Sequence, residues 1–450
     1  DEKLGEVLRM AARYDEALEA LDRAVEVYRE VRDLEAVGRT TARIGMAHRN
    51  RGTSEEGIAR VQPLLDLLAW SGPTPGLASL HLAIANLYFV SGRYRESVEA
   101  AERAAELARA VGDERILAGA EMRRGTGLAV LGQMEDGRAL LKGAIQLAEA
   151  VGDLETLGIA LNNLADASLK LGEPEEAGKY LKRALEILER TGHTGIIGFQ
   201  MECLGEALTY VGEWEEAAGY IERGAEIIRA VGASHWAAYG PVQRGNLRLH
   251  QGRWEEAARD LQETIALAEP TGDAQALGYA HSLLGELEVL QGRAEAACAR
   301  LEPLVAGDDP YVVPMSATLA WTYLELGDLN RSVETVQQGL RIARERRNGL
   351  WVPDVLRVQG MILARRGRWE EAEEAFREAV SLARTMPYPY AEARALYECG
   401  MMHVRREDPQ AACQPLQDAV AIFRRLGAQK DLEPAEQALA ALDRSADPAR

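Results

Sequence analysis

The sequence is poor in cysteine and in long apolar runs. It has 4 cysteines among 450 residues, Cys203, Cys298, Cys399 and Cys413, and no C-x-x-C spacing. This pattern predicts reduced thiols rather than a disulfide framework or a zinc site. No apolar run approaches the roughly 20 residues of a membrane helix, and the charged residues 1–3 are unlike a signal peptide. We therefore expect a cytoplasmic protein with no membrane partner.

Positive charge and catalytic motifs are also scarce. There are 52 Lys and Arg residues against 71 Asp and Glu, a net charge of −19, which argues against nucleic acid as a direct partner. The sequence lacks a phosphate-binding loop, a Gly-x-Ser-x-Gly elbow, a protein-kinase motif set and a His-Glu-x-x-His motif. Its 7 histidines form no i, i+4 metal pair. We predict no enzyme activity, no cofactor, no catalytic residue and no metal site.

What the sequence does have is a period of 40 residues. Glycine recurs at this step at Gly52, Gly92, Gly132, Gly172, Gly212, Gly252 and Gly292. The step then shortens to 35 residues, which gives Gly327, and returns to 40 at Gly367. Extending this register by 40 residues in each direction reaches Ala12 and Glu407. A period of this length is typical of a solenoid or an array of repeats.

Each period contains two segments with apolar residues at helical spacing, which predicts a pair of helices. The register glycine suits the left-handed end of the first helix, and the Glu-Glu pair that often follows suits the start of the second. A second turn, such as Val-Gly-Asp at 111–113, offers a glycine cap and an aspartate N-cap. Only small residues occur seven positions before and five positions after the register. We expect these small positions to face each other and let the two helices pack closely.

This pattern resembles the tetratricopeptide repeat (TPR). In the fifth repeat the residues that match its packing positions are Leu161, Leu164, Ala165, Gly172, Ala177, Leu181 and Ala184. The resemblance implies an all-α, right-handed α-solenoid superhelix of about eleven 40-residue helix pairs with a C-terminal capping helix. Long repeats of this kind also resemble the sensor region of bacterial signal-transduction ATPases of the STAND class, which includes the maltose-regulon activator. That resemblance implies an inducer that relieves the autoinhibition of an ATPase module.

Departures from the period suggest boundaries. We expect repeats one to eight in residues 1–305, repeats nine to eleven in 306–430, and a capping helix with a polar tail in 431–450. Asp1 falls inside the first helix of repeat one, so either this repeat is truncated and more protein lies upstream, or its first helix is genuinely short. Pro303 falls within a predicted helix, where proline kinks or stops the chain. The segment 303–314 is therefore either a hinge between two arms or an irregular turn in a rigid superhelix.

Binding residues are expected on the inner surface, which the first helix of each pair lines in repeats of this type. The inward stripe opposite the packing residues falls 13, 10, 6 and 2 residues before the register. In repeats five to eight this stripe is rich in aromatic residues and carboxylates. The predicted site comprises Asn162, Asp166, Phe199, Glu202, Glu206, Tyr210, Tyr239, Asn246, Tyr279 and Glu286. Trp236 precedes the seventh repeat and is either a wall of this site or a staple between repeats.

Three functions remain open for such a surface. The first is the ligand-sensing or partner-sensing domain of a larger cytoplasmic bacterial regulator, with a small-molecule inducer or a protein in the groove and an ATPase domain upstream. The second is a general protein-interaction scaffold that binds a peptide or a helix in the groove. The third is an interaction module attached to a protease or cyclase effector. Aromatic faces with a few fixed hydrogen-bonding groups suit a sugar, a peptide or an amine.

Overall fold

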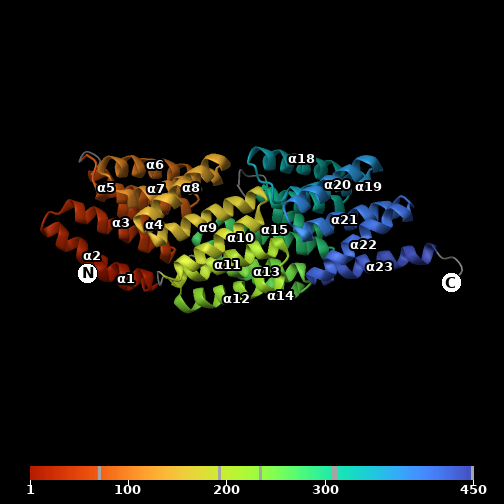
Figure 1. Ribbon diagram of the computed structural model, residues 1–450, viewed down its shortest axis with the longest axis horizontal. Helices are drawn as coiled ribbons and strands as arrows, with labels where there is room; N and C mark the ends of the chain where they lie inside the picture. The colour runs from red at the N-terminus through yellow and green to blue at the C-terminus, as the bar shows by residue number, and fades with distance from the viewer. Residues whose placement is uncertain (69–71, 191–193, 233–235, 306–311, 447–450) are drawn as a thin grey trace.

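A computed structural model describes residues 1–68, 72–190, 194–232, 236–305 and 312–446, and these residues form α-helices joined by short turns (Figure 1). The first helices of the pairs are α1 (Glu2–Met10), α3 (Leu34–Arg51), α5 (Pro75–Val90), α7 (Glu114–Val130), α9 (Leu154–Leu171), α11 (Thr194–Val211), α13 (Tyr239–His250), α15 (Ala274–Leu290), α17 (Val312–Glu325), α19 (Val352–Arg365) and α21 (Pro389–Arg405). The second helices are α2 (Tyr14–Glu30), α4 (Ser54–Leu68), α6 (Tyr94–Val111), α8 (Met134–Val151), α10 (Pro174–Leu188), α12 (Trp214–Val231), α14 (Trp254–Ala268), α16 (Ala294–Val305), α18 (Leu329–Glu345), α20 (Trp369–Thr385) and α22 (Pro409–Leu426). A last helix, α23 (Gln429–Ala446), follows the eleventh pair. These pairs confirm the predicted α-solenoid.

The turns between helices follow the predicted register. Gly52 and Gly172 end α3 and α9 with φ of 85° and 84°, in the left-handed region that glycine adopts most easily. Ala12 and Glu407, where the register predicts a turn without glycine, also have positive φ, 57° and 62°. At the second turn Asp113 accepts a hydrogen bond from the Ile116 amide at 2.9 Å. The predicted glycine and aspartate caps are therefore confirmed.

The small register positions bring the two helices of each pair into close contact. A Cβ at Gly125 would lie 2.8 Å from the carbonyl oxygen of Gly137, a distance that real side chains do not adopt. Where the second position is serine, its hydroxyl donates to the facing carbonyl, as Ser97 does to Ala85 at 2.8 Å. Larger side chains at these positions would separate the helices and open voids in a core packed at crystal density.

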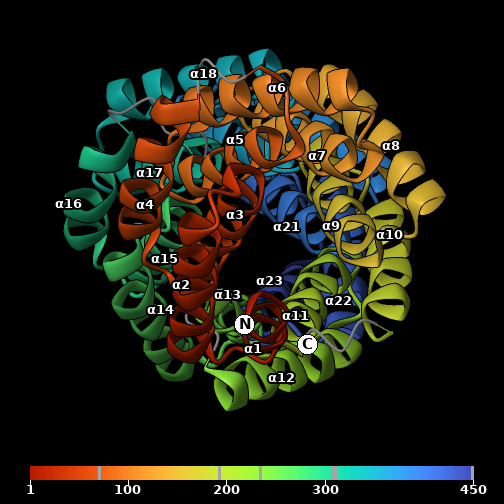
Figure 2. The same ribbon diagram turned by 90° about the vertical axis from the view of Figure 1, so that its left-hand side faces the viewer.

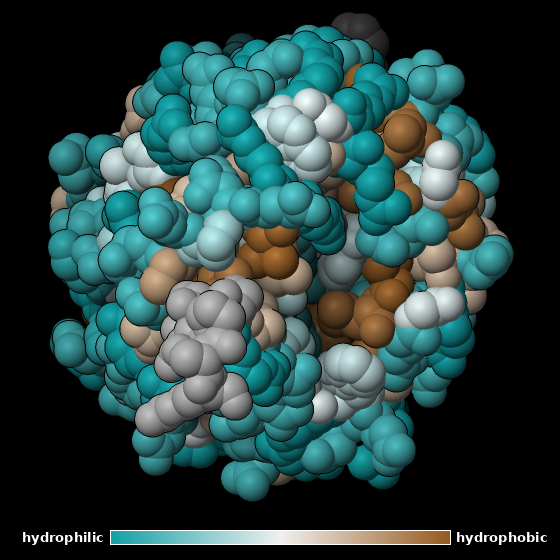
Figure 3. Space-filling view, turned by 90° about the vertical axis from the view of Figure 1, so that its right-hand side faces the viewer, coloured by the Kyte–Doolittle hydropathy of each residue, from teal (hydrophilic) through white to brown (hydrophobic). Residues whose placement is uncertain are grey.

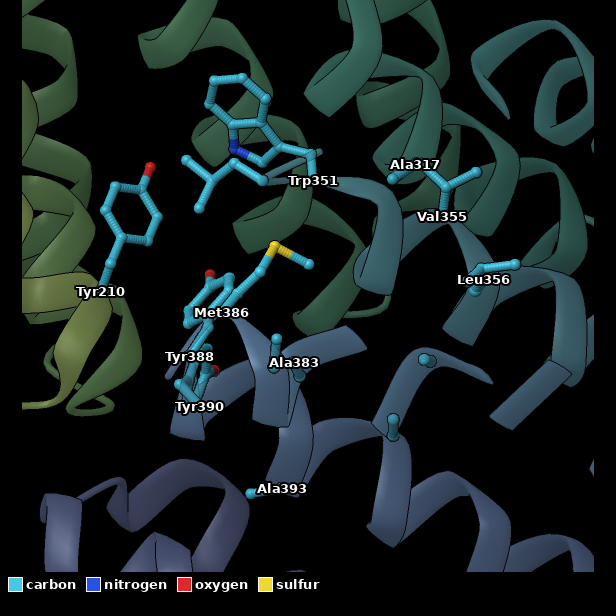
Figure 4. Packing of buried hydrophobic residues seen from close by; sticks show 14 of the residues in the cluster. Tyr210, Ala317, Trp351, Val355, Leu356, Ala383, Met386, Tyr388, Tyr390 and Ala393 are labelled. Carbon is cyan, nitrogen blue, oxygen red and sulfur yellow. The ribbon is translucent and has the colours of Figure 1, made fainter. Parts of the chain in front are cut away.

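The solenoid coils tightly enough for its second turn to pack on its first. The view along its long axis places α11, α13 and α21 toward the axis and α12, α14, α16 and α18 on the outside (Figure 2). The amide of Leu350 donates to the carbonyl of Lys170 at 3.2 Å, and Arg347 pairs with Glu135, 212 residues earlier in the chain. Tyr210 lies edge-on to Tyr388 with ring centroids 5.2 Å apart, and Figure 4 shows both in the cluster of buried residues that includes Met386. The inner surface is thus a channel rather than an open groove.

The hydrophobic core continues across the boundary predicted after residue 305. α16 continues past Pro303 to Val305, and Leu301, Val305 and Val312 belong to one hydrophobic cluster that extends into the last repeats. Residues 306–311 lie outside the described residues, so a hinge here stays a prediction. The predicted capping helix is present as α23 and reaches into the segment expected as a polar tail; residues 447–450 of that tail are likewise outside the description. None of the described helices combines the length and apolar character needed to cross a membrane.

Candidate ligand-binding channel

The channel contains two cavities, which we name the first and the second cavity. The first has a volume of about 190 Å³ and is lined by α3, α5, α7, α9, α11 and the start of α13, with residues 271–275 at one side. This volume is more than ten times the roughly 10–15 Å³ that one water molecule needs. The second cavity, of about 80 Å³, lies between α11, α13 and α15 of the first turn and α17, α19 and α21 of the second. At the C-terminal end of the molecule, hydrophobic residues gather around a hollow within a hydrophilic rim (Figure 3).

One side of the first cavity is aromatic and acidic. The ring of Phe199 stacks on Trp236 at 5.8 Å and meets Tyr239 edge-on at 5.1 Å. The Tyr239 hydroxyl donates to the Glu206 carboxylate. Burial raises the pKa of Glu206 to about 7, the bond from Tyr239 opposes that rise, and the nearby Asp166 adds to it. A cationic group of a ligand beside Glu206 would favour its charged form.

The opposite side of the first cavity is basic. Arg49 of α3 and Arg123 of α7 line it together with Phe89, Asn162 and Asn163. The Nε of Arg123 donates to Oδ1 of Asn86 at 2.7 Å, and its guanidinium lies 4.3 Å from the centroid of the Phe89 ring. Burial and the neighbouring Arg49 both lower the pKa of Arg123. The first cavity therefore changes from basic to acidic along the direction of the chain.

Ion pairs within the second turn and between the two turns line the second cavity. Arg394 of α21 contacts Glu286 of α15 at 3.0 Å and Asp354 at 3.5 Å. Asp354 also lies 3.6 Å from Arg357, whose guanidinium faces the ring of Trp321 at 5.1 Å. Arg394 and nearby cations lower the pKa of Glu286 in spite of its burial. Two guanidinium groups and two carboxylates thus compensate each other here.

The structure distributes the predicted site residues over both cavities. Asn162, Asp166, Phe199, Trp236 and Tyr239 line the first cavity. Tyr210, Asn246, Tyr279 and Glu286 line the second. Glu206 lines both, at the point where they adjoin. Trp236 combines its two expected roles, because it also packs in a cluster with Leu188, Ile196 and Ile228 of the neighbouring repeats.

Glu202 is the exception, since it lines neither cavity. Its side chain is 1% exposed and lies against Gly240, where any Cβ would collide with its carboxylate. It accepts a hydrogen bond from the Gly240 amide near the start of α13, and burial raises its pKa well above the usual range. The inward stripe predicted a groove position, but the absence of a side chain at residue 240 lets Glu202 bend into the interface between repeats. We therefore leave it out of the candidate site.

Sequence reasoning missed the residues that come from other parts of the superhelix. Arg49 and Arg123 lie outside repeats five to eight, and Arg123 falls nine residues before its register glycine, off the inward stripe. Arg357 and Arg394 lie in the tenth and eleventh repeats, and stacking of the turns brings them into the same cavity as Glu286 and Tyr279. The number of repeats in one superhelical turn decides this, and no residue pattern encodes it directly.

The stacked helix pairs and their lined channel define a helical repeat protein with a concave binding surface. Models of the tetratricopeptide repeat match residues 2–32, 116–190, 314–346 and 352–425. A model of anaphase-promoting complex subunit 5 matches residues 74–124 and 227–290. No curated protein matches the chain in sequence. The chain thus carries an array of tetratricopeptide repeats, and its resemblance to sensor regions of signal-transduction ATPases stays a prediction.

Solved structures share this architecture at low sequence identity. A Rap protein complexed with competence and sporulation factor matches with a TM-score of 0.58 and 15% identity, over 77% of this chain and 97% of the other. The Rap conjugation gene regulator of the plasmid pLS20 in complex with the Phr* peptide has a TM-score of 0.48 and 17% identity, over 70% and 77%. Human IFIT1 with PPP-AAAA has a TM-score of 0.47 and 14% identity, over 95% of both chains. The first of these matches shows the fold.

Proposed function

We propose that this interaction domain binds a peptide-sized ligand inside its channel, at the first cavity. The observation that carries the proposal is the wall formed by Phe199, Trp236 and Tyr239 beside the buried carboxylate of Glu206. Such a wall takes up an apolar or aromatic side chain, and the carboxylate holds an amine next to it. The Rap protein of similar fold is itself a complex with competence and sporulation factor. Arrays of this type are typically non-catalytic scaffolds.

Amide side chains favour a peptide over a compact small molecule. Oδ1 of Asn162 is buried in the cavity wall, and no residue that the structure describes donates a hydrogen bond to it. Nδ2 of the adjacent Asn163 donates to the Thr126 hydroxyl at 2.9 Å. An unpaired buried acceptor is costly, and a peptide amide would satisfy it. A small-molecule inducer with one amide group is the alternative ligand.

We further propose that the chain is the sensing domain of a larger signalling regulator, as its resemblance to signal-transduction ATPases implies. Lys170 supports a coupling between ligand and superhelix. Its ammonium group donates to Asp166 in the first cavity at 2.7 Å, while its carbonyl accepts the inter-turn hydrogen bond from Leu350. A ligand that moves Asp166 would therefore bias the spacing of the two turns, which an attached ATPase module could read.

The binding proposal is tested with pools of random pentapeptides. The full chain is incubated with the pools, separated by gel filtration, and the retained peptides are identified by mass spectrometry. We expect Phe199→Ala and Glu206→Gln to reduce retention at least tenfold with unchanged circular dichroism, whereas Glu255→Gln on the outer helix α14 retains wild-type binding. Absence of any retained peptide contradicts the proposal, and retention of a metabolite instead would favour the small-molecule alternative.

The sensing proposal has its own test. Hydrogen exchange of the Leu350 amide is measured with and without the retained peptide. A ligand that tightens the turns slows this exchange, and one that separates them accelerates it. An unchanged rate at saturation would leave the chain as an adaptor without a switch. Sequencing of the reading frame on both sides of residues 1 and 450 then shows whether an ATPase module is attached.

A further inference from the structure

Arg123 is an almost fully buried cation without a counterion. It is 2% exposed and makes the one hydrogen bond to Asn86 described above. In the part of the chain that the structure describes, no carboxylate comes within ion-pair distance of it, and the nearest charged group that influences it is Arg49, a second cation. Taking an ion out of water costs several kcal/mol unless an opposite charge compensates. The uncompensated charge of Arg123 lies at the wall of the channel rather than in a packed core.

Arg49 adds to the same excess of positive charge. Its Nε is buried and has no hydrogen-bond partner among the described residues. The carboxylate that influences it, Glu155, already contacts Arg9 at 3.3 Å, and Arg9 also pairs with Glu6 at 2.6 Å. Glu155 is thus shared between Arg9 and Arg49, and among the described residues no carboxylate pairs with Arg123.

Other buried arginines of the described residues differ in this respect. Arg394 pairs with Glu286 at 3.0 Å, and Arg9 pairs with Glu155 at 3.3 Å. Both are structural contacts between helices. Arg123 and Arg49 instead line the first cavity, together with Asn162 and Asn163. Their arrangement suits a counterion that arrives with a ligand.

We propose that Arg123 and Arg49 bind an anionic group of the ligand, a carboxylate or a phosphate, at the N-terminal side of the first cavity. A guanidinium fork contacts two oxygen atoms of such a group at once. The proposal deepens the function proposed above and rests on it for the remainder of the ligand. It also fixes the orientation of that ligand: the anionic end lies against α3 and α7, and the apolar or cationic end lies against Phe199 and Glu206. A peptide would then bind with its C-terminus toward α7.

The experiment compares wild type with Arg123→Gln, and with Arg253→Gln as a control in an exposed pair on the outside of α14. Pentapeptide pools made without Asp and Glu are prepared as free acids and as C-terminal amides. Inorganic phosphate and pyrophosphate serve as competitors, and each is also tested alone by its effect on the melting temperature. We expect wild type and Arg253→Gln to retain free acids at least tenfold better than amides, and Arg123→Gln to retain both equally. Arg49→Gln is the second variant should Arg123→Gln fail to fold.

Each outcome decides one proposal. Discrimination of acids from amides that Arg123→Gln abolishes supports a carboxylate. If pyrophosphate displaces the peptide from wild type, or raises its melting temperature, and has neither effect on Arg123→Gln, a phosphate is supported. Thermal stabilisation without any retained peptide would still support the anion site, and the peptide proposal alone would fail. Equal retention of acids and amides without any effect of phosphate or pyrophosphate overturns the anion site and leaves peptide binding intact. If neither peptide retention nor an effect of the anions is observed, both proposals are overturned.

Discussion

The two cavities of the channel are lined by the same kinds of residue, aromatic rings, carboxylates and guanidinium groups, but they treat charge differently. In the second cavity Arg394 of α21 contacts both Glu286 of α15 and Asp354 of α19, so one guanidinium meets carboxylates from two other helices. In the first cavity, as far as the described residues go, Arg123 contacts no carboxylate, and Glu206 contacts a tyrosine hydroxyl but no cation. Lys170 and Asp166 form an ion pair in this cavity, but Arg123 and Glu206 line it from different helices, α7 and α11, and do not pair with each other.

This difference separates a structural role from a binding role. Paired charges in the second cavity connect α15 of the first turn to α21 of the second, and they hold the turns together. Separated charges in the first cavity lower the stability of the empty channel and increase the gain when a dipolar ligand enters. The same residue types thus connect the turns of the superhelix in one place, and we propose that they bind a partner in another.

The largest effect is expected from a substitution that breaks the paired charges of the second cavity. Arg394→Gln leaves Glu286 buried without its principal counterion, and we expect a loss of about 3–5 kcal/mol in the free energy of unfolding. Urea unfolding followed by circular dichroism measures it. Arg377→Gln removes an exposed pair with Glu373 on α20 and should cost no more than about 0.5 kcal/mol. Similar losses in the two variants would mean that the second cavity is not a structural lock.

A pH dependence should come from the uncompensated side. The pKa of Glu206 is raised to about 7 from an ordinary value of 4.5, so the native state binds a proton that the unfolded chain has released between these values. Stability contributed by this group is complete below pH 4.5 and falls as the pH rises through 7, by about 3 kcal/mol in total. The free energy of unfolding is measured with urea at pH values from 4.5 to 8 in wild type and in Glu206→Gln. The difference between the two curves isolates the contribution of Glu206. Glu255→Gln, an exposed control, should follow wild type, and a parallel curve for Glu206→Gln would refute the shift.

The stacking of turns can be tested with two matched glycines. Gly92 and Gly212 both have positive φ, 73° and 89°, so alanine costs about 1–2 kcal/mol at either position. A Cβ at Gly92 meets nothing within 4 Å, whereas at Gly212 it would lie 2.8 Å from Leu426 and 2.9 Å from Pro389 of the second turn. We expect Gly212→Ala to lose an additional 1–3 kcal/mol or so by overpacking. Equal losses measured by urea unfolding would show that the turns are apart in solution.

The register explains why the fold could be predicted and part of the site could not. Spacing alone identified turns without glycine at Ala12 and Glu407, because the helix period is a local property of the chain. It also placed Phe199, Glu206 and Tyr239 on the inner surface. Contacts such as that of Arg394 with Glu286 depend on small rotations summed over several repeats, which no local pattern specifies. Glu202 left the predicted stripe because a residue of the next repeat, Gly240, has no side chain.

The smallest expected effect is a gain in stability, opposite in sign to the loss expected for Arg394→Gln. Arg123→Gln removes a buried charge without stranding a carboxylate, and glutamine can still donate to Asn86. The lost contact with the Phe89 ring costs about 0.5–1 kcal/mol, and the desolvation that no longer has to be met is several kcal/mol before relaxation. We therefore expect the variant to be about 1 kcal/mol more stable than wild type when both are free of ligand, measured by urea unfolding in a buffer without multivalent anions. The same substitution at residue 394 destabilises, so opposite signs for one chemical change would demonstrate that the two cavities differ in compensation rather than in burial. A loss of stability at both positions would mean that Arg123 is paired with a carboxylate in solution. The first cavity would then give no reason to expect an anionic group of a ligand.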